Sequence, residues 1–216
     1  MTWNNAVLGR TEQRAMKREA LLRQAAAAFN SKGFQASSLD DLAASLGVTK
    51  AALYYYFPNK QKLLLACFER VMEAGFRSIE KAQVEGKNGR EKVHLAIKYY
   101  LDEIIDEMSC CVVLTDEHFL LPEDRAVHIE QRDRYEKMLR NMINEGINDK
   151  SIASCDPKLV IFTLLGSINW IPKWFSHGGE WSSRQVAVAM SEILDRAISA
   201  DPKPSLTIAV KDLDVS

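Results

Sequence analysis

The helical spacing of the apolar residues, which continues along almost all 216 residues, is the feature that most constrains the fold. Leu22, Ala25, Ala26 and Phe29 follow the i, i+3, i+4, i+7 rule and so share one face of a helix. Later segments repeat this spacing, and no segment shows the alternation of a strand ladder or an internal repeat. We therefore expect an all-α protein of about nine helices.

One expected helix is apolar on nearly every side. Asp156 and Pro157 precede it as an N-cap followed by proline at the first helical position. The helix then runs from Leu159 to about Phe175, and Pro172 is expected to kink it because proline lacks the amide hydrogen. A helix of this composition must be buried on several sides.

Charge is distributed unevenly along the chain. Residues 1–70 hold ten Lys/Arg and five Asp/Glu, whereas the remainder holds 18 and 24, so a net charge of +5 is followed by one of −6. A basic N-terminal region on an acidic body suggests that only the N-terminal region contacts a polyanion. Chance clustering of charges on solvated faces is the alternative.

The composition excludes several classes of protein. No apolar run reaches the roughly 18 residues that span a bilayer, and residues 1–10 lack the pattern of a signal peptide. We therefore expect a cytoplasmic protein without a membrane partner. The four cysteines, Cys67, Cys110, Cys111 and Cys155, show neither CxxC nor zinc spacing. Adjacent Cys110 and Cys111 are either a redox pair or small apolar residues of a buried helix.

Enzymatic motifs are missing from the sequence. It contains no P-loop, GxSxG, HExxH or dinucleotide fingerprint, and its four histidines pair with no nucleophile or metal ligand by spacing. We expect no catalytic residues, no metal and no cofactor.

Two short helices joined by a tight turn predict a helix-turn-helix. Ser38 can cap the first helix and Thr49 the second, while Gly47 permits the turn between them. Leu53 and Phe57 are expected in the core. The three consecutive tyrosines at 54–56 cannot all be core residues, because successive side chains of a helix point about 100° apart.

The run LDDLAASLGVTKAALYYYFPNKQKL, residues 39–63, closely resembles the DNA-binding module of the TetR family, and the match extends over about residues 15–65. The resemblance implies phosphate contacts from Ser38 and Lys60. It also implies recognition-helix contacts from Thr49, Lys50, Ala51, Ala52, Tyr54, Tyr55 and Tyr56. Many relatives carry polar residues where this chain has the two alanines, so DNA shape and thymine methyl groups would contribute more to recognition.

The C-terminal half resembles one branch of that family. The segments HIEQRDRYEKMLRNMINEGINDKSI and DPKLVIFTLLGSINWIPKWF are similar to regulators of fatty-acid and steroid degradation that bind acyl-CoA thioesters. The resemblance implies an acyl-CoA effector. Candidate partners for the CoA phosphates are Arg132, Arg134, Lys173 and Arg184, for which simple solvation is the alternative.

Two apolar helices near the C-terminus suggest a homodimer. Two copies of a two-helix surface, related by a two-fold axis, would form a four-helix bundle. The expected interface residues are Leu164, Leu165, Ile168, Ile171, Val186, Met190, Ile193 and Leu194. For each of these residues alone, packing within one chain is the alternative.

A cavity for the effector is expected among aromatic residues that are interspersed with a few polar groups. The candidates are Tyr100, Ile104, Cys111, Leu114, His118, Phe119, Arg132, Tyr135, Met138, Phe162, Asn169, Trp170 and Trp174. Each of them could instead be an ordinary core residue.

These patterns predict four parts: a flexible arm (1–12), a helix-turn-helix domain (13–60), an effector-binding and dimerisation domain (61–200) and a tail (201–216). The expected function is a repressor that a small hydrophobic effector, preferably an acyl-CoA, releases from a palindromic operator in double-stranded DNA. The alternatives are a sensor of a free hydrophobic compound or drug, and a helical interaction protein that does not bind DNA.

Overall fold

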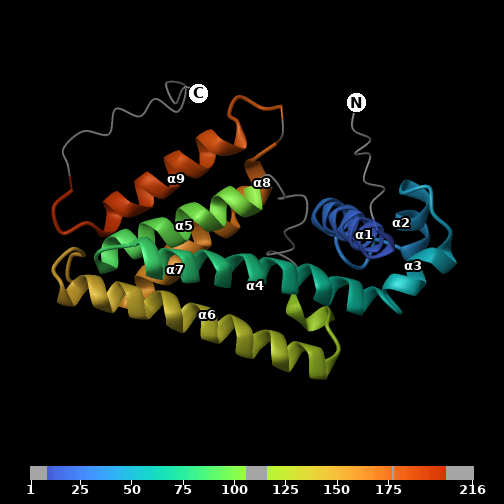
Figure 1. Cartoon of the computed structure of the whole chain (residues 1–216), viewed down its shortest axis with the longest axis horizontal. Coiled ribbons are helices and arrows are strands. Elements are labelled where there is room, and N and C mark those ends of the chain that lie inside the picture. Colours follow the sequence, from blue (N-terminus) through green and yellow to red (C-terminus); the bar gives the residue numbers. More distant parts are fainter. Residues whose placement is uncertain (1–8, 106–115, 177, 203–216) are drawn as a thin grey trace, which may run out of the picture.

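The computed structural model describes residues 9–105, 116–176 and 178–202, and this part of the chain is helical (Figure 1). The β structure of these described residues is limited to one antiparallel bridge, between Ile152 and Ser199. The helices are α1 (Arg10–Lys32), α2 (Leu39–Ser45), α3 (Lys50–Tyr56), α4 (Lys60–Glu85), α5 (Gly89–Ile105), the 3-10 helix η2 (Glu117–Phe119), α6 (Pro122–Asn148), α7 (Pro157–Asn169), α8 (Ile171–Trp174) and α9 (Ser183–Ile198). The expected all-α class is confirmed.

Two hydrophobic cores divide the molecule into a head (α1–α3 and the start of α4) and a body (the rest of α4, with α5–α9). Figure 1 shows the head at one end and α4 running from it along the body. The start of α4 contributes Leu63, Leu64 and Phe68 to the head core, whereas Ile79 and Ala82 belong to the body core. A single continuous helix therefore joins the two parts, and the head core extends beyond residue 60.

The helix boundaries in the head are formed by local hydrogen bonds, including those at the expected caps Ser38 and Thr49. The side chain of Ser38 accepts from the amide of Asp41 at 2.9 Å, and that of Asn59 accepts from Lys62 at 2.7 Å. Thr49 caps α3 in the same way. Gly33 ends α1 with a φ of 83°, a conformation that favours glycine. The caps therefore fix where α2, α3 and α4 begin.

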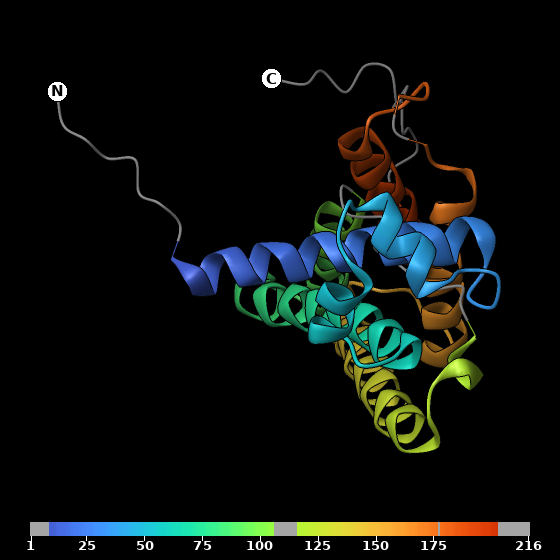
Figure 2. The same ribbon diagram turned by 90° about the vertical axis from the view of Figure 1, so that its right-hand side faces the viewer.

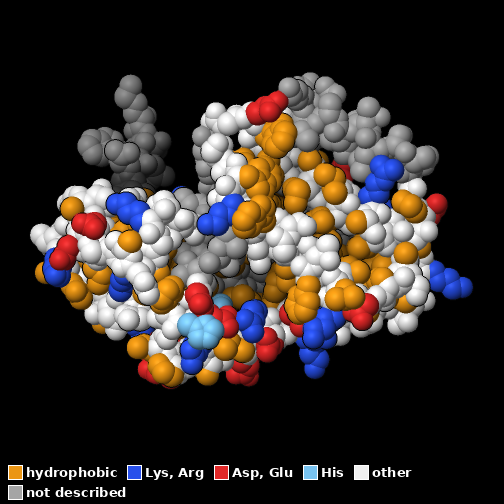
Figure 3. Space-filling view, turned by 180° about the vertical axis from the view of Figure 1, so that it is seen from behind, with side chains coloured by type: hydrophobic (Ala, Val, Ile, Leu, Met, Phe, Trp, Pro, Cys, Tyr) orange, Lys and Arg blue, Asp and Glu red, His pale blue; other side chains and the backbone are white. Residues whose placement is uncertain are grey.

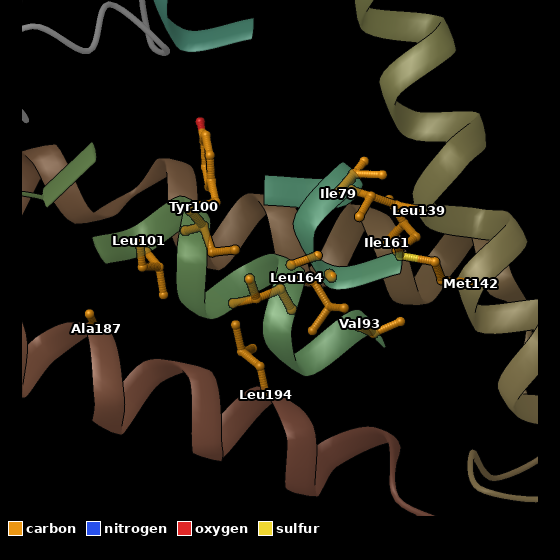
Figure 4. Packing of buried hydrophobic residues seen from close by; sticks show 14 of the residues in the cluster. Ile79, Val93, Tyr100, Leu101, Leu139, Met142, Ile161, Leu164, Ala187 and Leu194 are labelled. Atoms are coloured by element: carbon orange, nitrogen blue, oxygen red, sulfur yellow. The ribbon is translucent and has the colours of Figure 1, made fainter. Parts of the chain in front are cut away.

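Helix α5 lies in the middle of the body, between α4 and α6 on one side and α9 on the other. Figure 4 shows Leu101 of α5 pointing towards α9, from which Ala187 and Leu194 point back, and Leu164 of α7 belongs to the same core. At one end of this core the first residue of α5, Gly89, lies directly against Gly146 of α6. The apolar faces that the sequence predicts are thus buried together in one core.

The long apolar helix expected from Leu159 to Phe175 is interrupted. Helix α7 ends at Asn169, Trp170 follows as its cap, and α8 is a separate single turn with Pro172 as its second residue. Pro172 has no amide hydrogen to donate to the preceding turn, so the regular bonding pattern stops there. The last helix begins after Ser182, which forms a capping box with Gln185.

Candidate nucleic-acid interface and cavity

The turn between α2 and α3 positions α3 on the surface of the head. Gly47 adopts a φ of 64°, and Leu53, which is fully buried, anchors α3 against the head core. On the solvent side of α3, Tyr54 is 41% exposed and Tyr55 is 65% exposed. The exposed tyrosines and the neighbouring Ala51 therefore form a surface that a groove of DNA could accept.

Tyr56 differs from the other two tyrosines. It is half-buried, packs against the head core and contacts the ring of Tyr55 edge-on, with ring centroids 5.3 Å apart. Its ring therefore contributes to packing as well as to the surface.

The two lysines expected to contact DNA already have partners in the head. Lys50 forms an ion pair with Asp40 at 2.8 Å. Lys60 donates to the carbonyl of Gln35 at 3.3 Å and lies 4.2 Å above the ring of Phe34, and its partial burial lowers its pKa. The capping hydroxyls of Ser38 and Thr49 accept from helix amides, which leaves their O–H groups free to donate. Ala52 is half-buried on α3.

A cavity of about 540 Å³ lies in the body between α4, α5, α6 and α7, with η2 at its edge. Five of the expected effector residues line it: Tyr100, Arg132, Tyr135, Phe162 and Asn169. Sequence reasoning missed the other lining residues, Phe68, Val71, Met72, Glu117, His128, Asp133, Glu136, Leu165 and Gly166. The sequence does not distinguish the α4 residues of the cavity from core residues, because the same helical period predicts that both are buried.

Eight further candidates remain. Cys111 and Leu114 fall outside the described residues, and the other six lie away from the cavity. Ile104 is buried in the body core, against which Met138 also packs. His118 is exposed and contacts Asp116, while Trp170 and Trp174 are exposed on the outside of α7–α8. Phe119 stacks on Phe34 of the head at 4.9 Å. These six candidates therefore do not line this cavity.

Tyr135 forms one wall of the cavity. Its ring lies over Gly75, where an added Cβ would come within 2.8 Å of it, so glycine makes room for the tyrosine. The edge of Phe76 meets the same ring, with centroids 5.8 Å apart. Burial raises the pKa of Tyr135, so its hydroxyl stays protonated and can donate a hydrogen bond to a ligand.

Carboxylates outnumber cations at the cavity. Arg132 is bound by Glu117 at 2.6 Å and also contacts Asp133, and Glu136 pairs with Arg140 at 2.8 Å. Of the other basic residues considered for CoA phosphates, Lys173 and Arg184 do not line this cavity, and Arg134 lies over Phe76. Of the four expected basic residues, Arg132 is therefore the one that lines the cavity as the described residues form it.

His128 lies on the cavity wall and stacks on Phe68, with ring centroids 4.5 Å apart. Burial disfavours its charged form and lowers its pKa below the ordinary value of about 6.5. The unfolded chain therefore binds this proton more readily, so the stability that neutral His128 contributes is present above about pH 6.5 and is lost as the pH falls.

We expect the free energy of unfolding to fall more steeply between about pH 7 and pH 5.5 in the wild type than in His128→Phe, which keeps the stacked ring but cannot be protonated. Urea unfolding at several pH values measures the two slopes. Equal slopes would remove His128 as a source of acid sensitivity.

The expected dimer residues divide into two groups. Leu164, Ile168, Ile171, Val186 and Leu194 are buried in the body core of one chain, so little of each side chain remains for a partner. Leu165 and Met190 are half-buried, and Ile193 is exposed. The opposite side of α7–α8 is exposed instead, with Leu159, Trp170 and Trp174, and with Phe162, which also lines the cavity. From behind, hydrophobic side chains gather over the body, and a column of them rises near its junction with the head (Figure 3).

Comparison with known proteins gives matches over both parts of the chain. A family model described as "Bacterial regulatory proteins, tetR family" matches residues 21–67, and one described as "Tetracyclin repressor-like, C-terminal domain" matches residues 86–198. The chain is 23% identical over 177 residues to the HTH-type transcriptional repressor KstR2 of Mycolicibacterium smegmatis, a match that covers 81% of this chain and 86% of that protein.

Solved structures share the fold. PfmR, a TetR-family transcriptional regulator from Thermus thermophilus, superposes with a TM-score of 0.71 and 29% identity, covering 82% of this chain and 97% of its own. AibR, whose structure holds isovaleryl coenzyme A and operator DNA, superposes with a TM-score of 0.69 and 24% identity over the same shares of the two chains.

Proposed function

The chain belongs to the TetR family of bacterial regulatory proteins, and from this premise we propose that it is a repressor that a small hydrophobic effector releases from its operator. The observation that carries the proposal is the α2–turn–α3 unit, which holds Tyr54 and Tyr55 exposed on a short helix anchored by Leu53. The relatives support it, because KstR2 is named a repressor and AibR was solved on operator DNA. A protein with this role works in the cytoplasm, where the DNA is.

The operator is proposed to be palindromic double-stranded DNA bound by a homodimer. Recognition helices of a two-fold dimer enter successive major grooves, about 34 Å apart or a multiple of that distance. The exposed apolar side of α7–α8, with Leu159, Trp170 and Trp174, and Ile193 of α9 form the surface that a second copy would cover. Large exposed apolar surfaces of this kind mark interaction sites.

The cavity is proposed to hold the effector. Phe68, Tyr135 and Phe162 offer an apolar wall for an acyl chain, and the hydroxyl of Tyr135 offers a donor for a carbonyl oxygen. Arg132 could leave Glu117 to bind a phosphate with its planar fork. An acyl-CoA thioester fits these groups, and the isovaleryl coenzyme A in AibR supports it.

A free hydrophobic compound is the second candidate. The acidic residues Glu117, Asp133 and Glu136 at the cavity favour it, because they repel the phosphates of CoA. Under this alternative the same cavity would accept a neutral or cationic ligand.

The release of a labelled operator separates the two candidates, once an operator has been selected from a random duplex pool. We expect an acyl-CoA to release the protein at micromolar concentrations, about −8 kcal/mol of binding, whereas the matching free acid and CoA alone should act far more weakly. Fluorescence anisotropy with a series of chain lengths measures this. If the free acid is as effective as the thioester, the acyl-CoA assignment is wrong and the second candidate replaces it.

A short connection runs from the cavity to the head. Glu117 of η2 binds Arg132, and two residues later Phe119 stacks on Phe34, next to Leu120 in the head core. Lys62 at the start of α4 also pairs with Asp124 of α6 at 2.8 Å. A ligand that draws Arg132 away from Glu117 would shift η2 and, through it, the head. The effector would then bind the shifted conformation more tightly than the DNA-binding one, and this difference in affinity would release the operator.

A further inference from the structure

The two lysines near the recognition helix are held by contacts within the head. Lys50 is neutralised by Asp40, and Lys60 is held by the carbonyl of Gln35 and the ring of Phe34. Affinity for DNA depends mainly on the neutralisation of phosphates by Lys and Arg. Further cations in the head would therefore raise its affinity for a duplex.

The first half of α1 carries such cations and packs against little else. All residues from Thr11 to Arg18 are exposed, and Figure 2, which looks onto the head, shows these turns projecting beyond the other helices. Arg14, Lys17 and Arg18 lie here, and none of them forms an ion pair with the residues that the structure describes. A helix that is exposed all round buries no apolar face that would explain its extension.

Two of these cations, Arg14 and Arg18, lie on the side of α1 that faces the recognition helix and its C-terminal end. The guanidinium carbon of Arg14 is 5.1 Å from the ring centroid of Tyr55, and that of Arg18 is 5.3 Å from the ring centroid of Phe57. Arg14 and Arg18 are four residues apart and so share one face of α1. Tyr55 is the most exposed tyrosine of α3, so Arg14 lies at the border of the surface that α3 presents.

We propose that the first half of α1 is a second DNA-contact element, in which Arg14, Lys17 and Arg18 bind phosphates beside the groove that α3 enters. Arginine suits this position because its planar group can stack on an aromatic ring and still donate to phosphate oxygens. These contacts supply affinity without reading the sequence, whereas α3 supplies the selectivity. The inference rests on the proposed function, since it assumes that the protein binds duplex DNA.

The test compares the salt dependence of duplex binding for the wild type and the variant Arg14→Gln/Lys17→Gln/Arg18→Gln. Each lost phosphate contact reduces the slope of log affinity against log salt by about 0.9, so the slope should become shallower by about two to three. Affinity should fall by a similar factor for the operator and for an unrelated duplex. The control Lys81→Gln/Lys87→Gln/Lys137→Gln removes the same charge from exposed positions on the body. Circular dichroism checks that both variants remain helical.

An unchanged slope in the α1 variant, beside a wild type that binds duplexes, would overturn this inference alone. An equal loss in the control variant would also overturn it, because net charge rather than α1 would then set the slope. If the wild type binds no duplex at any salt concentration, the proposed function and this inference are both wrong.

Discussion

Replacing Tyr54 and Tyr55 together by alanine is expected to weaken operator binding by about 100-fold, since each lost contact is worth about 1–2 kcal/mol. Both side chains leave the exposed face of α3, and neither belongs to the head core, so the free energy of unfolding should change by less than about 1 kcal/mol. Anisotropy titration of a labelled operator measures the first quantity, and urea unfolding measures the second.

Two control variants separate the possible causes of the loss. Tyr54→Phe/Tyr55→Phe keeps the rings and removes the hydroxyl groups, so it reports whether hydrogen bonds to phosphates or ring contacts dominate. Tyr99→Phe changes a tyrosine of the body whose hydroxyl binds Glu85, and it should leave operator affinity unchanged. Normal operator binding by the alanine variant would show that α3 is not the DNA surface.

Tyr56 shows where sequence reasoning about this helix was incomplete. The 100° rotation between successive residues correctly indicated that three tyrosines could not all be buried. It could not say which of them turns inward, because that depends on the direction from which α1 and α4 approach. In the structure Tyr56 packs against the head core while Tyr55 faces solvent.

The helix boundaries of the head were predictable because their causes are local. Ser38, Thr49 and Asn59 each accept a hydrogen bond from an amide three residues later, and such a bond depends on the sequence alone. Gly33 and Gly47 likewise adopt positive φ values where one chain segment turns. The helix boundaries of the head were therefore predictable from contacts between residues close in the sequence.

The cavity depended on contacts between distant segments and was only partly predictable. Tyr135 has its place because Gly75, sixty residues earlier, leaves space for its ring. Phe119 looked like a cavity residue but stacks on Phe34 of the head instead. A helical period identifies an apolar face, but it does not identify which helix covers that face.

Helix α7 shows the same limit for the dimer surface. Both of its faces are apolar, so the sequence could not tell which face turns inward. Leu164 and Ile168 occupy the buried face, and Leu159 and Phe162 occupy the exposed one. The expected interface includes Leu164 and Ile168, which are buried within one chain, so we propose the exposed face for the contact with a second copy.

Gly89→Ala is expected to destabilise the protein by about 3 kcal/mol or more, the largest effect on folding that we predict. An added Cβ at Gly89 would come within 2.0 Å of the amide nitrogen of Gly146 and 2.4 Å of its Cα, so α5 and α6 would have to separate. These are backbone atoms of a helix and cannot move aside as the end of a side chain can. The amide of Gly89 also donates to Asp149 at 2.8 Å, and this bond would be strained at the same time.

Two matched glycine variants give this prediction a graded control. At Gly146 the added Cβ meets the side chain of Ile152 at 2.5 Å, which can shift, so Gly146→Ala should be less harmful than Gly89→Ala. At Gly9 the nearest atom is 3.9 Å away and φ is −59°, so Gly9→Ala should have almost no effect. Urea unfolding at one fixed protein concentration measures all three variants, since the stability of a dimer depends on concentration. If Gly89→Ala is as stable as Gly9→Ala, α5 and α6 do not approach each other this closely. The arrangement of the two helices at the cavity would then be wrong as well.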